Sequence, residues 1–188
     1  MSSLGGEKYA VQKPIINYVK EQSAEYISQD GNKIFIKLGW EYVSPDEALR
    51  LRGGKTGLVF KEIFINQMQR LNPGFMDHLL AEEVIKKLET VLPNIEGNFT
   101  AWKYLKGLGT IFVPGEKRER NIKFLDTEDI DRNTFHVTDE FEFTNGTKTI
   151  RPDIVFLVNG VPLLLIETKA AYKIEGISEA LEQVKRYH

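Results

Sequence analysis

Three charged residues stand out in an otherwise apolar stretch of the sequence, IRPDIVFLVNGVPLLLIETKA (Ile150–Ala170). Asp153 begins the first apolar run, and Glu167 and Lys169 end the second. Two carboxylates repel each other unless a cation lies between them. Mg²⁺ suits that position because it prefers oxygen ligands, and the backbone carbonyl of Thr168 could be a further one. A metal-bound water can attack phosphorus, and Lys169 could orient or deprotonate that water and stabilise charge on the phosphoryl oxygens. The set therefore indicates metal-assisted hydrolysis of a phosphodiester.

The register of the hairpin decides whether these side chains meet. Asn159-Gly160, between the two apolar runs, predicts a tight turn. A strict two-residue loop pairs position 153 with 166, which puts Asp153 and Glu167 on opposite faces. A three-residue loop with Gly160 in the left-handed conformation pairs 153 with 165, which puts them on one face. The site hypothesis therefore predicts a loop of odd length.

Such a trio also arises by chance, because strand ends that leave a core commonly carry charges. Two features favour a site. Both strands are apolar throughout, which is typical of strands that are covered on both faces and central in a sheet. Gln183 and Tyr187 lie four residues apart, on one face of the helix predicted next. Taken alone, that pair is more typical of a polar helix flank.

The elements around the hairpin change from helical to extended along the chain. Apolar spacing and capping signals, such as Ser44 before Pro45, predict helices in the first half, and alternation predicts strands after Gly115. The stretch 33–43 fits either type. The predicted helices are 14–28, 44–52, 58–74, 75–93, 98–109 and 178–188, and the predicted strands are 121–126, an alternating hairpin within 134–153, 154–158 and 161–166.

These elements predict a mixed α/β domain in three stretches. Residues 1–13 are expected to form a flexible arm, 14–115 a mainly helical part, and 116–188 a sheet with a closing helix. All belong to one structural domain. Because the sequence stops inside a predicted helix, we expect it to be a piece of a longer protein.

Composition excludes several classes of protein. The 188 residues are 41% hydrophobic, enough for a substantial core. The absence of cysteine excludes disulfides and thiolate metal sites. No window approaches eighteen uncharged apolar residues, so no membrane span is expected. The net charge of -2 argues against a large autonomous nucleic-acid surface and leaves room for a local basic patch.

Two other motifs carry little chemistry. RGGKTG lacks a phosphate loop's first glycine, since that position is Leu49, and we interpret Gly53–Thr56 as a loop that ends a helix. His78, His136 and His188 are scattered and form no metal-ligand spacing.

RPDIVFLVNGVPLLLIETKA, followed by EQVKRY, resembles the PD-(D/E)XK nuclease superfamily. Within it, the sequence resembles the N-terminal domain of the R (restriction, HsdR) subunit of type I restriction-modification enzymes. An ordered series of segments carries the resemblance from Gly39 to His188: GWEYVSPDEALRLRGG, QMQRLNP, EGNFTAWKYLKG, IKFLD and NTFHVTDEFEF. It implies a restriction-endonuclease-like core, in which helices flank a central mixed β-sheet, preceded by a helical N-terminal half.

The resemblance also implies roles for individual residues. Asp153 and Glu167 would be Mg²⁺ ligands, and Lys169 the catalytic lysine. Gln183 and Tyr187 would form the Q-x-x-x-Y element that borders the active site and supports DNA contact.

Some relatives carry a further acidic residue in an early helix near the metal, for which Glu25 and Glu21 are candidates. The implied activity is that of a type I site-specific deoxyribonuclease, which cuts double-stranded DNA without sequence preference of its own in the bacterial or archaeal cytoplasm. Recognition would come from a specificity (S) subunit and methylation from modification (M) subunits. ATP would serve a translocase later in the same chain and would not bind here.

A rival interpretation keeps the fold without the chemistry, as a module that docks to the motor or methyltransferase subunits or clamps DNA. Residues 58–92 would then be a contact surface. A stand-alone repair or phage-type nuclease fits the ordered segments less well.

Overall fold

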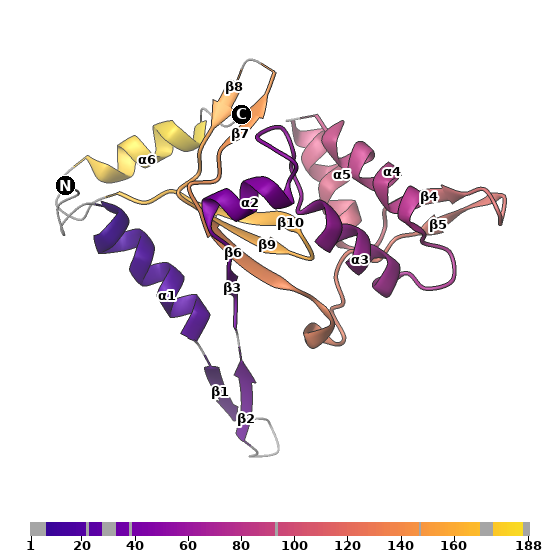
Figure 1. The fold of residues 1–188 in the computed structure, drawn as a ribbon, viewed down its shortest axis with the longest axis horizontal. Coiled ribbons are helices and arrows are strands. Elements are labelled where there is room, and N and C mark those ends of the chain that lie inside the picture. The colour runs from indigo at the N-terminus through magenta and orange to yellow at the C-terminus, as the bar shows by residue number, and fades with distance from the viewer. Residues whose placement is uncertain are drawn as a thin grey trace.

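The structure is a computed structural model that describes residues 7–21, 23–27, 33–37, 39–92, 94–146, 148–169 and 175–185 (Figure 1). Its helical elements are η1 (Lys8–Gln12, a π-helical turn), α1 (Lys13–Glu21), α2 (Pro45–Leu51), α3 (Lys61–Leu71), α4 (His78–Glu89), α5 (Ile95–Leu105), η2 (Ile130–Arg132) and α6 (Gly176–Lys185). Its strands are β1 (Ser23–Ile27), β2 (Lys33–Lys37), β3 (Glu41–Tyr42), β4 (Thr110–Val113), β5 (Arg118–Asn121), β6 (Phe135–Asp139), β7 (Phe143–Asn145), β8 (Lys148–Ile150), β9 (Ile154–Val158) and β10 (Val161–Ile166). The mixed α/β class predicted from the sequence is confirmed.

A four-stranded mixed sheet in the order β10-β9-β6-β3 forms the centre of the fold. β3 runs parallel to β6, and the other neighbours are antiparallel. β9 is central and almost entirely buried, as predicted. The expectation that β10 is also central is wrong: β10 is an edge strand, and its Leu163, Leu164 and Leu165 are exposed. An apolar run alone does not distinguish a central strand from an apolar edge.

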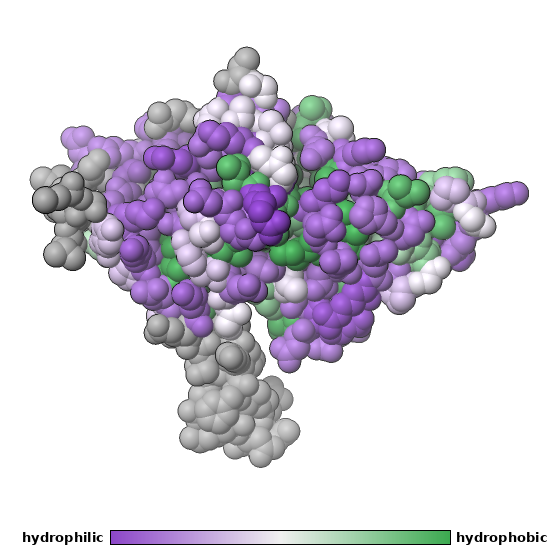
Figure 2. All heavy atoms as spheres, in the orientation of Figure 1, coloured by the Kyte–Doolittle hydropathy of each residue, from purple (hydrophilic) through white to green (hydrophobic). Residues whose placement is uncertain are grey.

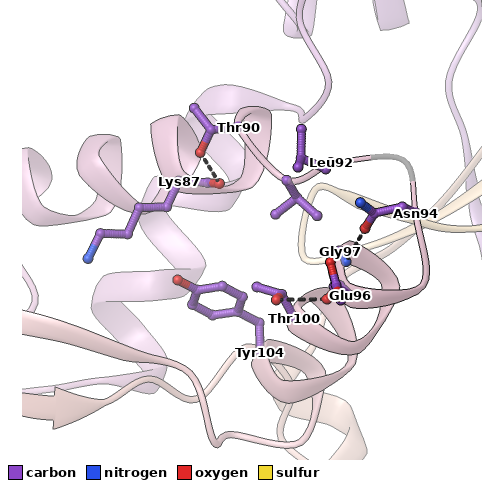
Figure 3. Close-up of a pocket in the computed structure, with 9 residues that line it drawn as sticks. Lys87, Thr90, Leu92, Asn94, Glu96, Gly97, Thr100 and Tyr104 are labelled. Atoms are coloured by element: carbon purple, nitrogen blue, oxygen red, sulfur yellow. Dashed lines mark hydrogen bonds between the residues drawn. The ribbon is translucent and has the colours of Figure 1, made fainter.

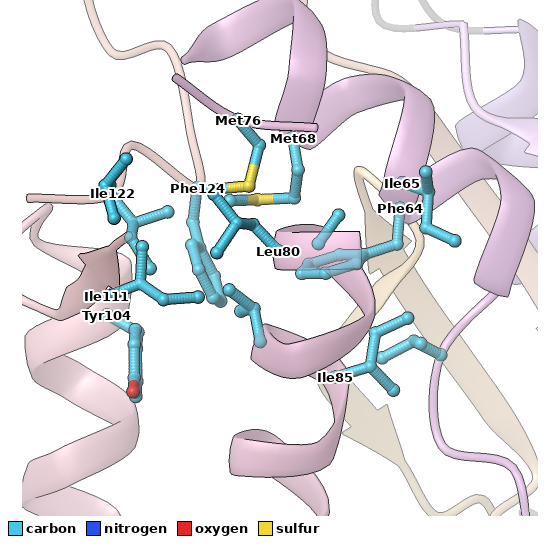
Figure 4. Packing of buried hydrophobic residues seen from close by; sticks show 14 residues of the cluster. Phe64, Ile65, Met68, Met76, Leu80, Ile85, Tyr104, Ile111, Ile122 and Phe124 are labelled. Atoms are coloured by element: carbon cyan, nitrogen blue, oxygen red, sulfur yellow. The ribbon is translucent and has the colours of Figure 1, made fainter. Parts of the chain in front are cut away.

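Helices cover both faces of this sheet. On one face α1 packs through Ile16 against Ile154 and Phe156. On the other, α2 and α3 pack against Val155 and Leu157. The largest buried cluster lies beyond α3, where α3, α4 and α5 enclose side chains from β4 and the segment after β5 (Figure 4).

Helix signals in the sequence were reliable where a cap was present. Ser44 caps α2 by accepting a hydrogen bond from the backbone N–H of Glu47, as predicted. Asp77 and Asn94 cap α4 and α5 in the same way.

Three predicted elements differ in the structure. The helix expected at 14–28 ends at Glu21, because Ser23–Ile27 pairs with Lys33–Lys37 as a hairpin. The strand expected at 121–126 instead ends at Asn121, where its pairing with β4 ends. The flexible arm expected at 1–13 is helical from Lys8 onward, since it packs on the end of the central sheet; residues 1–6 lie outside the described chain.

No helix in the described part of the chain is long and apolar enough to span a membrane.

Candidate active site

The closed end of the β9–β10 hairpin is fixed by its Asn-Gly turn. Asn159 and Gly160 both have positive φ, 53° and 80°, the conformation that a two-residue hairpin turn requires. The buried Asn159 side chain accepts a hydrogen bond from Thr134 N at 2.8 Å and donates one to Phe124 O at 2.8 Å. Gly160 O accepts from Phe60 N at 2.9 Å, and a Cβ at Gly160 would lie 2.8 Å from Phe60 O. The turn is thus tied to the start of α3, and the opposite end of the hairpin is left to carry the charged residues.

The prediction of an odd-length loop is wrong, but the strands do shift in register by one residue, at a different place. Val158 pairs with Val161, so the loop has two residues. The register then slips by one between Pro162 and Leu164, and Ile154 pairs with Ile166. This irregularity, a β-bulge within the edge strand, replaces the bulge expected at the turn.

The slipped register decides where the carboxylates project. Continued by one residue, it sets Asp153 opposite Glu167, so their side chains leave the sheet on the same side. Without the bulge Asp153 would face Ile166. The bulge therefore gives the register that the site hypothesis needs.

Asp153 is held in place by Thr168. Its Oδ2 accepts hydrogen bonds from Thr168 N at 2.7 Å and from Thr168 Oγ1 at 2.9 Å. Thr168 is buried, and Glu167 beside it is half-buried with its Oε2 enclosed. The turn at the end of β10 thus holds the Asp153 carboxylate close to the backbone that carries Glu167.

Lys169 joins the same end of the hairpin. Its Nζ donates to Gln183 Oε1 at 2.9 Å, so α6 lies beside the hairpin mouth. The Lys169 Nζ also lies 3.9 Å from Glu7 Oε1, and its side chain is only 17% exposed. Tyr187, the second residue of the predicted Q-x-x-x-Y element, lies outside the described residues.

The π-helical turn η1 brings in two residues that the sequence analysis missed. Glu7 Oε1 lies 3.0 Å from Thr168 Oγ1 and shares its single hydroxyl proton with Asp153 Oδ2. Gln12 Nε2 donates a hydrogen bond to Thr168 Oγ1 at 3.3 Å. Gln12 is 4% exposed, and its Oε1 is buried with no hydrogen-bond partner among the described groups. A buried amide oxygen of this kind is typical of a group that serves a bound molecule or water.

Glu7 contacts Thr168 and Lys169, and it was not among the candidates for the early acidic residue, Glu21 and Glu25, which stay predictions. Glu21 ends α1 and lies fourteen positions after Glu7, about 20 Å along a helix. Glu25 lies further on, in the β1–β2 hairpin that projects from the far end of α1 (Figure 1). The side chains of both lie outside the described part. Glu7 gave no signal in the sequence, since it sits in a glycine-rich start that resembles an arm.

A polar clasp holds η1 against the sheet. Lys8 Nζ lies 3.2 Å from the buried carboxylate of Asp139, which ends β6. Tyr42 OH donates to Asp139 Oδ1 at 2.7 Å. Burial first, and then the bond to Asp139, raise the pKa of Tyr42 to about 12, so the phenol stays a donor at neutral pH. Lys8 adjoins Glu7, so the clasp fixes the turn from which Glu7 reaches Thr168.

The donor atoms at this mouth are oxygens. Carboxylates from Asp153, Glu167 and Glu7 and the carbonyl of Thr168 are the ligand types that suit Mg²⁺, and no thiolate or imidazole is present. As the described side chains are arranged, no three acidic or histidine residues form a cluster that could hold an ion. The donor chemistry thus fits a hard cation, with Glu7 engaged by Thr168 and Lys169.

Two hollows lie away from the hairpin mouth. A cavity of about 370 Å³ between the end of α4 and the start of α5 is lined by apolar side chains such as Val91 and Leu92 together with polar ones (Figure 3). The polar groups bond locally to the backbone: Thr90 Oγ1 donates to Lys87 O, Gly97 N donates to Asn94 Oδ1, and Thr100 Oγ1 donates to Glu96 O. They form no reactive set.

The second hollow, about 520 Å³, lies beside β3 and α2 and contains His136. Burial lowers the pKa of His136, an effect that Glu41, 3.7 Å from Nε2, partly opposes. Neither hollow brings together residues predicted for the chemistry.

The fold and the mouth of the hairpin together define a class. A mixed sheet with an Asp before its inner strand and Glu-x-Lys after its edge strand is consistent with a restriction-endonuclease-like fold. The chain belongs to the family described as type I restriction enzyme R protein N terminus (HSDR_N), whose family model matches residues 21–188.

Individual relatives agree with this family. A protein of Methanocaldococcus jannaschii named as the endonuclease subunit of type I restriction enzyme MjaVIIP is 41% identical over 85 residues, 45% of this chain. The corresponding MjaVIIIP subunit is 27% identical over 168 residues, 86% of this chain. The HindI endonuclease subunit of Haemophilus influenzae is 29% identical over 161 residues, 80% of this chain. These matches cover 8%, 16% and 15% of the three relatives, so the chain spans a small part of their length.

Proposed function

We propose that this chain is an Mg²⁺-dependent endonuclease domain that hydrolyses phosphodiester bonds of double-stranded DNA without intrinsic sequence specificity. The observation that supports the proposal is the β-bulge in β10, whose register, continued by one residue, sets Asp153 opposite Glu167, two residues before Lys169. If these charges only marked the point where a strand leaves the core, no shift in register would be required. Family membership supports the same function.

Each residue at the mouth has a distinct role in this proposal. Among the described residues, the hydrogen bonds that Asp153 accepts from Thr168 go to Oδ2, so we assign Oδ1 to the cation, together with Glu167 and the Thr168 carbonyl. When bound, Mg²⁺ lowers the pKa of a coordinated water and screens the charge of a phosphoryl group. Lys169, oriented by Gln183, places its ammonium where it can hold the attacking water or the phosphoryl oxygens.

Glu7 supplies the acidic residue that an early helix contributes in some relatives. Its carboxylate lies between Thr168 Oγ1 and Lys169 Nζ, at 3.0 and 3.9 Å. From there it limits the freedom of the lysine ammonium and adds negative charge next to the cation ligands. Gln12, with its buried unpartnered Oε1, completes the polar wall.

The wider assembly is part of the proposal. In it the chain works in the cytoplasm of a bacterium or archaeon, with modification and specificity subunits and an ATP-driven translocase that delivers DNA. The relatives named as endonuclease subunits of type I restriction enzymes support this arrangement.

The test uses the assembled restriction enzyme and measures DNA cleavage and DNA-stimulated ATP hydrolysis together. We expect Lys169→Ala to abolish cleavage, by at least a hundredfold, and to leave ATP hydrolysis intact, because the lysine serves only the nuclease site. The matched control is Lys86→Ala, an exposed lysine on α4, which should change neither rate. Cleavage that survives Lys169→Ala would overturn the proposal in favour of a docking module.

A further inference from the structure

The strands that carry the site continue beyond it as a narrow ribbon. Asp139 pairs with Ile154 at the end of the central sheet, and Phe143 pairs with Ile150 in the small β7–β8 sheet. Backbone bonds from Glu140 N to Asp153 O at 3.0 Å, and from Phe141 N to Pro152 O, join the two ladders without a change of register. β6–β9 and β7–β8 are therefore one antiparallel ribbon, which bends where Glu140 adopts a positive φ of 52°.

The ribbon extends past the proposed catalytic residues. Five residues separate Glu140, bonded to Asp153, from Asn145 at the end of β7, which corresponds to roughly 17 Å of extended chain. It projects from the open end of the hairpin, at the top of the view, with α6 beside it (Figure 1). The ribbon therefore projects from the same end of the sheet as the proposed catalytic residues (Figure 1).

The base of the ribbon is held by a buried arginine. Arg52 is 5% exposed, and its guanidinium donates to Glu142 O at 2.9 Å, Gly57 O at 3.0 Å and Ala48 O at 3.3 Å. It also lies 3.7 Å from the ring centroid of Phe141. Burial lowers the pKa of Arg52 to about 10, still charged at neutral pH. Such an anchor keeps the ribbon at a fixed angle to the site.

The loop after α2 also bonds to the ribbon. Thr144 N donates to Lys55 O at 2.9 Å, and Lys55 Nζ donates to Glu142 Oε1 at 2.7 Å. Lys55 Nζ therefore lies along one side of the ribbon, with its charge held by Glu142.

The ribbon presents polar groups to solvent. Thr144 and Thr149 face each other across it with hydroxyls 3.0 Å apart, and Asn145, Lys148 and Thr149 are exposed. The part of the ribbon visible near its tip is white to purple (Figure 2). At the base of the ribbon, Phe141 and Phe143 pack on the apolar cluster that contains Val155 and Leu157. Core packing therefore explains the base of the ribbon, and the polar residues further out have no such role.

We propose that the β7–β8 ribbon lies in the major groove of double-stranded DNA and holds the duplex over the hairpin mouth. The major groove admits a two-stranded β-ribbon, and threonine, asparagine and lysine are common phosphate contacts. Lys148 at the tip binds one phosphate, and Lys55 at the side binds another when the DNA competes with Glu142. This inference rests on the proposed function, since it assumes the same substrate.

The test measures DNA affinity without cleavage. A labelled 30-base-pair duplex is titrated with the chain in Ca²⁺ buffer, by fluorescence anisotropy, from 50 to 200 mM salt. Lys148→Ala should weaken binding several-fold and reduce the slope of log Kd against log salt by about 0.9, the contribution of one phosphate contact. Lys86→Ala on α4 is the matched control and should change neither quantity.

For a second variant we expect tighter rather than weaker DNA binding. Glu142→Gln removes the carboxylate that competes for Lys55, so it should tighten binding and steepen the salt dependence. Lys148→Ala equal to the control, or native protein without measurable binding at 50 mM salt, would overturn the ribbon's role.

The outcome is separable from that of the nuclease test. If Lys169→Ala abolishes cleavage while Lys148→Ala binds DNA like the control, the active site stands and the ribbon assignment falls. If Lys148→Ala weakens DNA binding while Lys169→Ala still cleaves, the ribbon stands and the catalytic assignment falls.

Discussion

The two sides of this molecule are held together by different forces. The α3–α4–α5 layer is an apolar cluster in which Phe64, Ile65, Val84 and Ile111 are at most 1% exposed (Figure 4). The hairpin mouth is held by hydrogen bonds and ion pairs among η1, β6, β10 and α6. The first region contributes most of the buried area and therefore most of the hydrophobic stabilisation, and the second arranges charge at little gain in stability.

This difference shows that the residues proposed for catalysis lie apart from the apolar core of the α3–α4–α5 layer. Oxygen and nitrogen groups at the mouth are supported by neighbours that are themselves polar, such as Thr168, Gln12 and Tyr42. The two regions touch where Gly160 O meets Phe60 N, at the closed end of the hairpin. Changes in one region should therefore leave the other largely intact, and the following predictions test that separation.

The largest expected effect is on stability, from the apolar layer. Phe64→Ala should lower the free energy of unfolding by about 3–5 kcal/mol, because it removes a buried ring that packs edge-to-face on Phe124. Urea unfolding measures the change. Phe99→Ala on α5, 53% exposed, is the control and should cost far less. Equal losses for the two variants would contradict the ranking.

A smaller effect is expected at the clasp. Tyr42→Phe leaves Asp139 Oδ1 without its donor and should lower the free energy of unfolding by about 1–2 kcal/mol. Amide hydrogen exchange should show faster exchange in η1, with α4 unchanged. If η1 keeps its protection, the clasp does not position Glu7.

The pH dependence of stability tests the buried His136, which lies on β6 in the central sheet. Burial holds the pKa of His136 below its ordinary value, so the unfolded chain binds more protons than the folded one between the two pKa values. Stability should therefore fall as pH is lowered from neutral through about 6.5, the unfolded pKa, toward the lower folded pKa. His136→Gln should reduce this loss, whereas the exposed His78→Gln should not. Stability that rises on acidification over this range would contradict the assignment.

The smallest effect on stability is expected for Glu7→Gln. This residue is partly exposed, and its contacts with described residues are those to Thr168 Oγ1 and, at longer range, to Lys169 Nζ, so the change should stay within about 0.5 kcal/mol. The same variant should weaken Mg²⁺ binding. A large loss of stability with unchanged Mg²⁺ affinity would make Glu7 a structural residue.

Much of the fold could be predicted from the sequence, because caps and turns are local. Ser44, Asn145-Gly146 and Asn159-Gly160 each lie at the predicted helix start or hairpin, and the charged trio was found from spacing alone. What could not be predicted depends on contacts distant in sequence. The bulge between Pro162 and Leu164, the edge position of β10 and the arrival of Glu7 beside Thr168 are set by packing between elements up to 161 positions apart.

The central proposal is that Asp153 and Glu167 at the mouth of the hairpin bind Mg²⁺, with Glu7 adding negative charge beside them. Calorimetric titration of Mg²⁺ into the chain tests this most directly, with native protein, Asp153→Asn and the control Glu89→Gln, an exposed carboxylate on α4. We predict one binding event in the native protein and in the control, weakened at least tenfold by Asp153→Asn. Equal Mg²⁺ binding by native protein and Asp153→Asn would contradict the account.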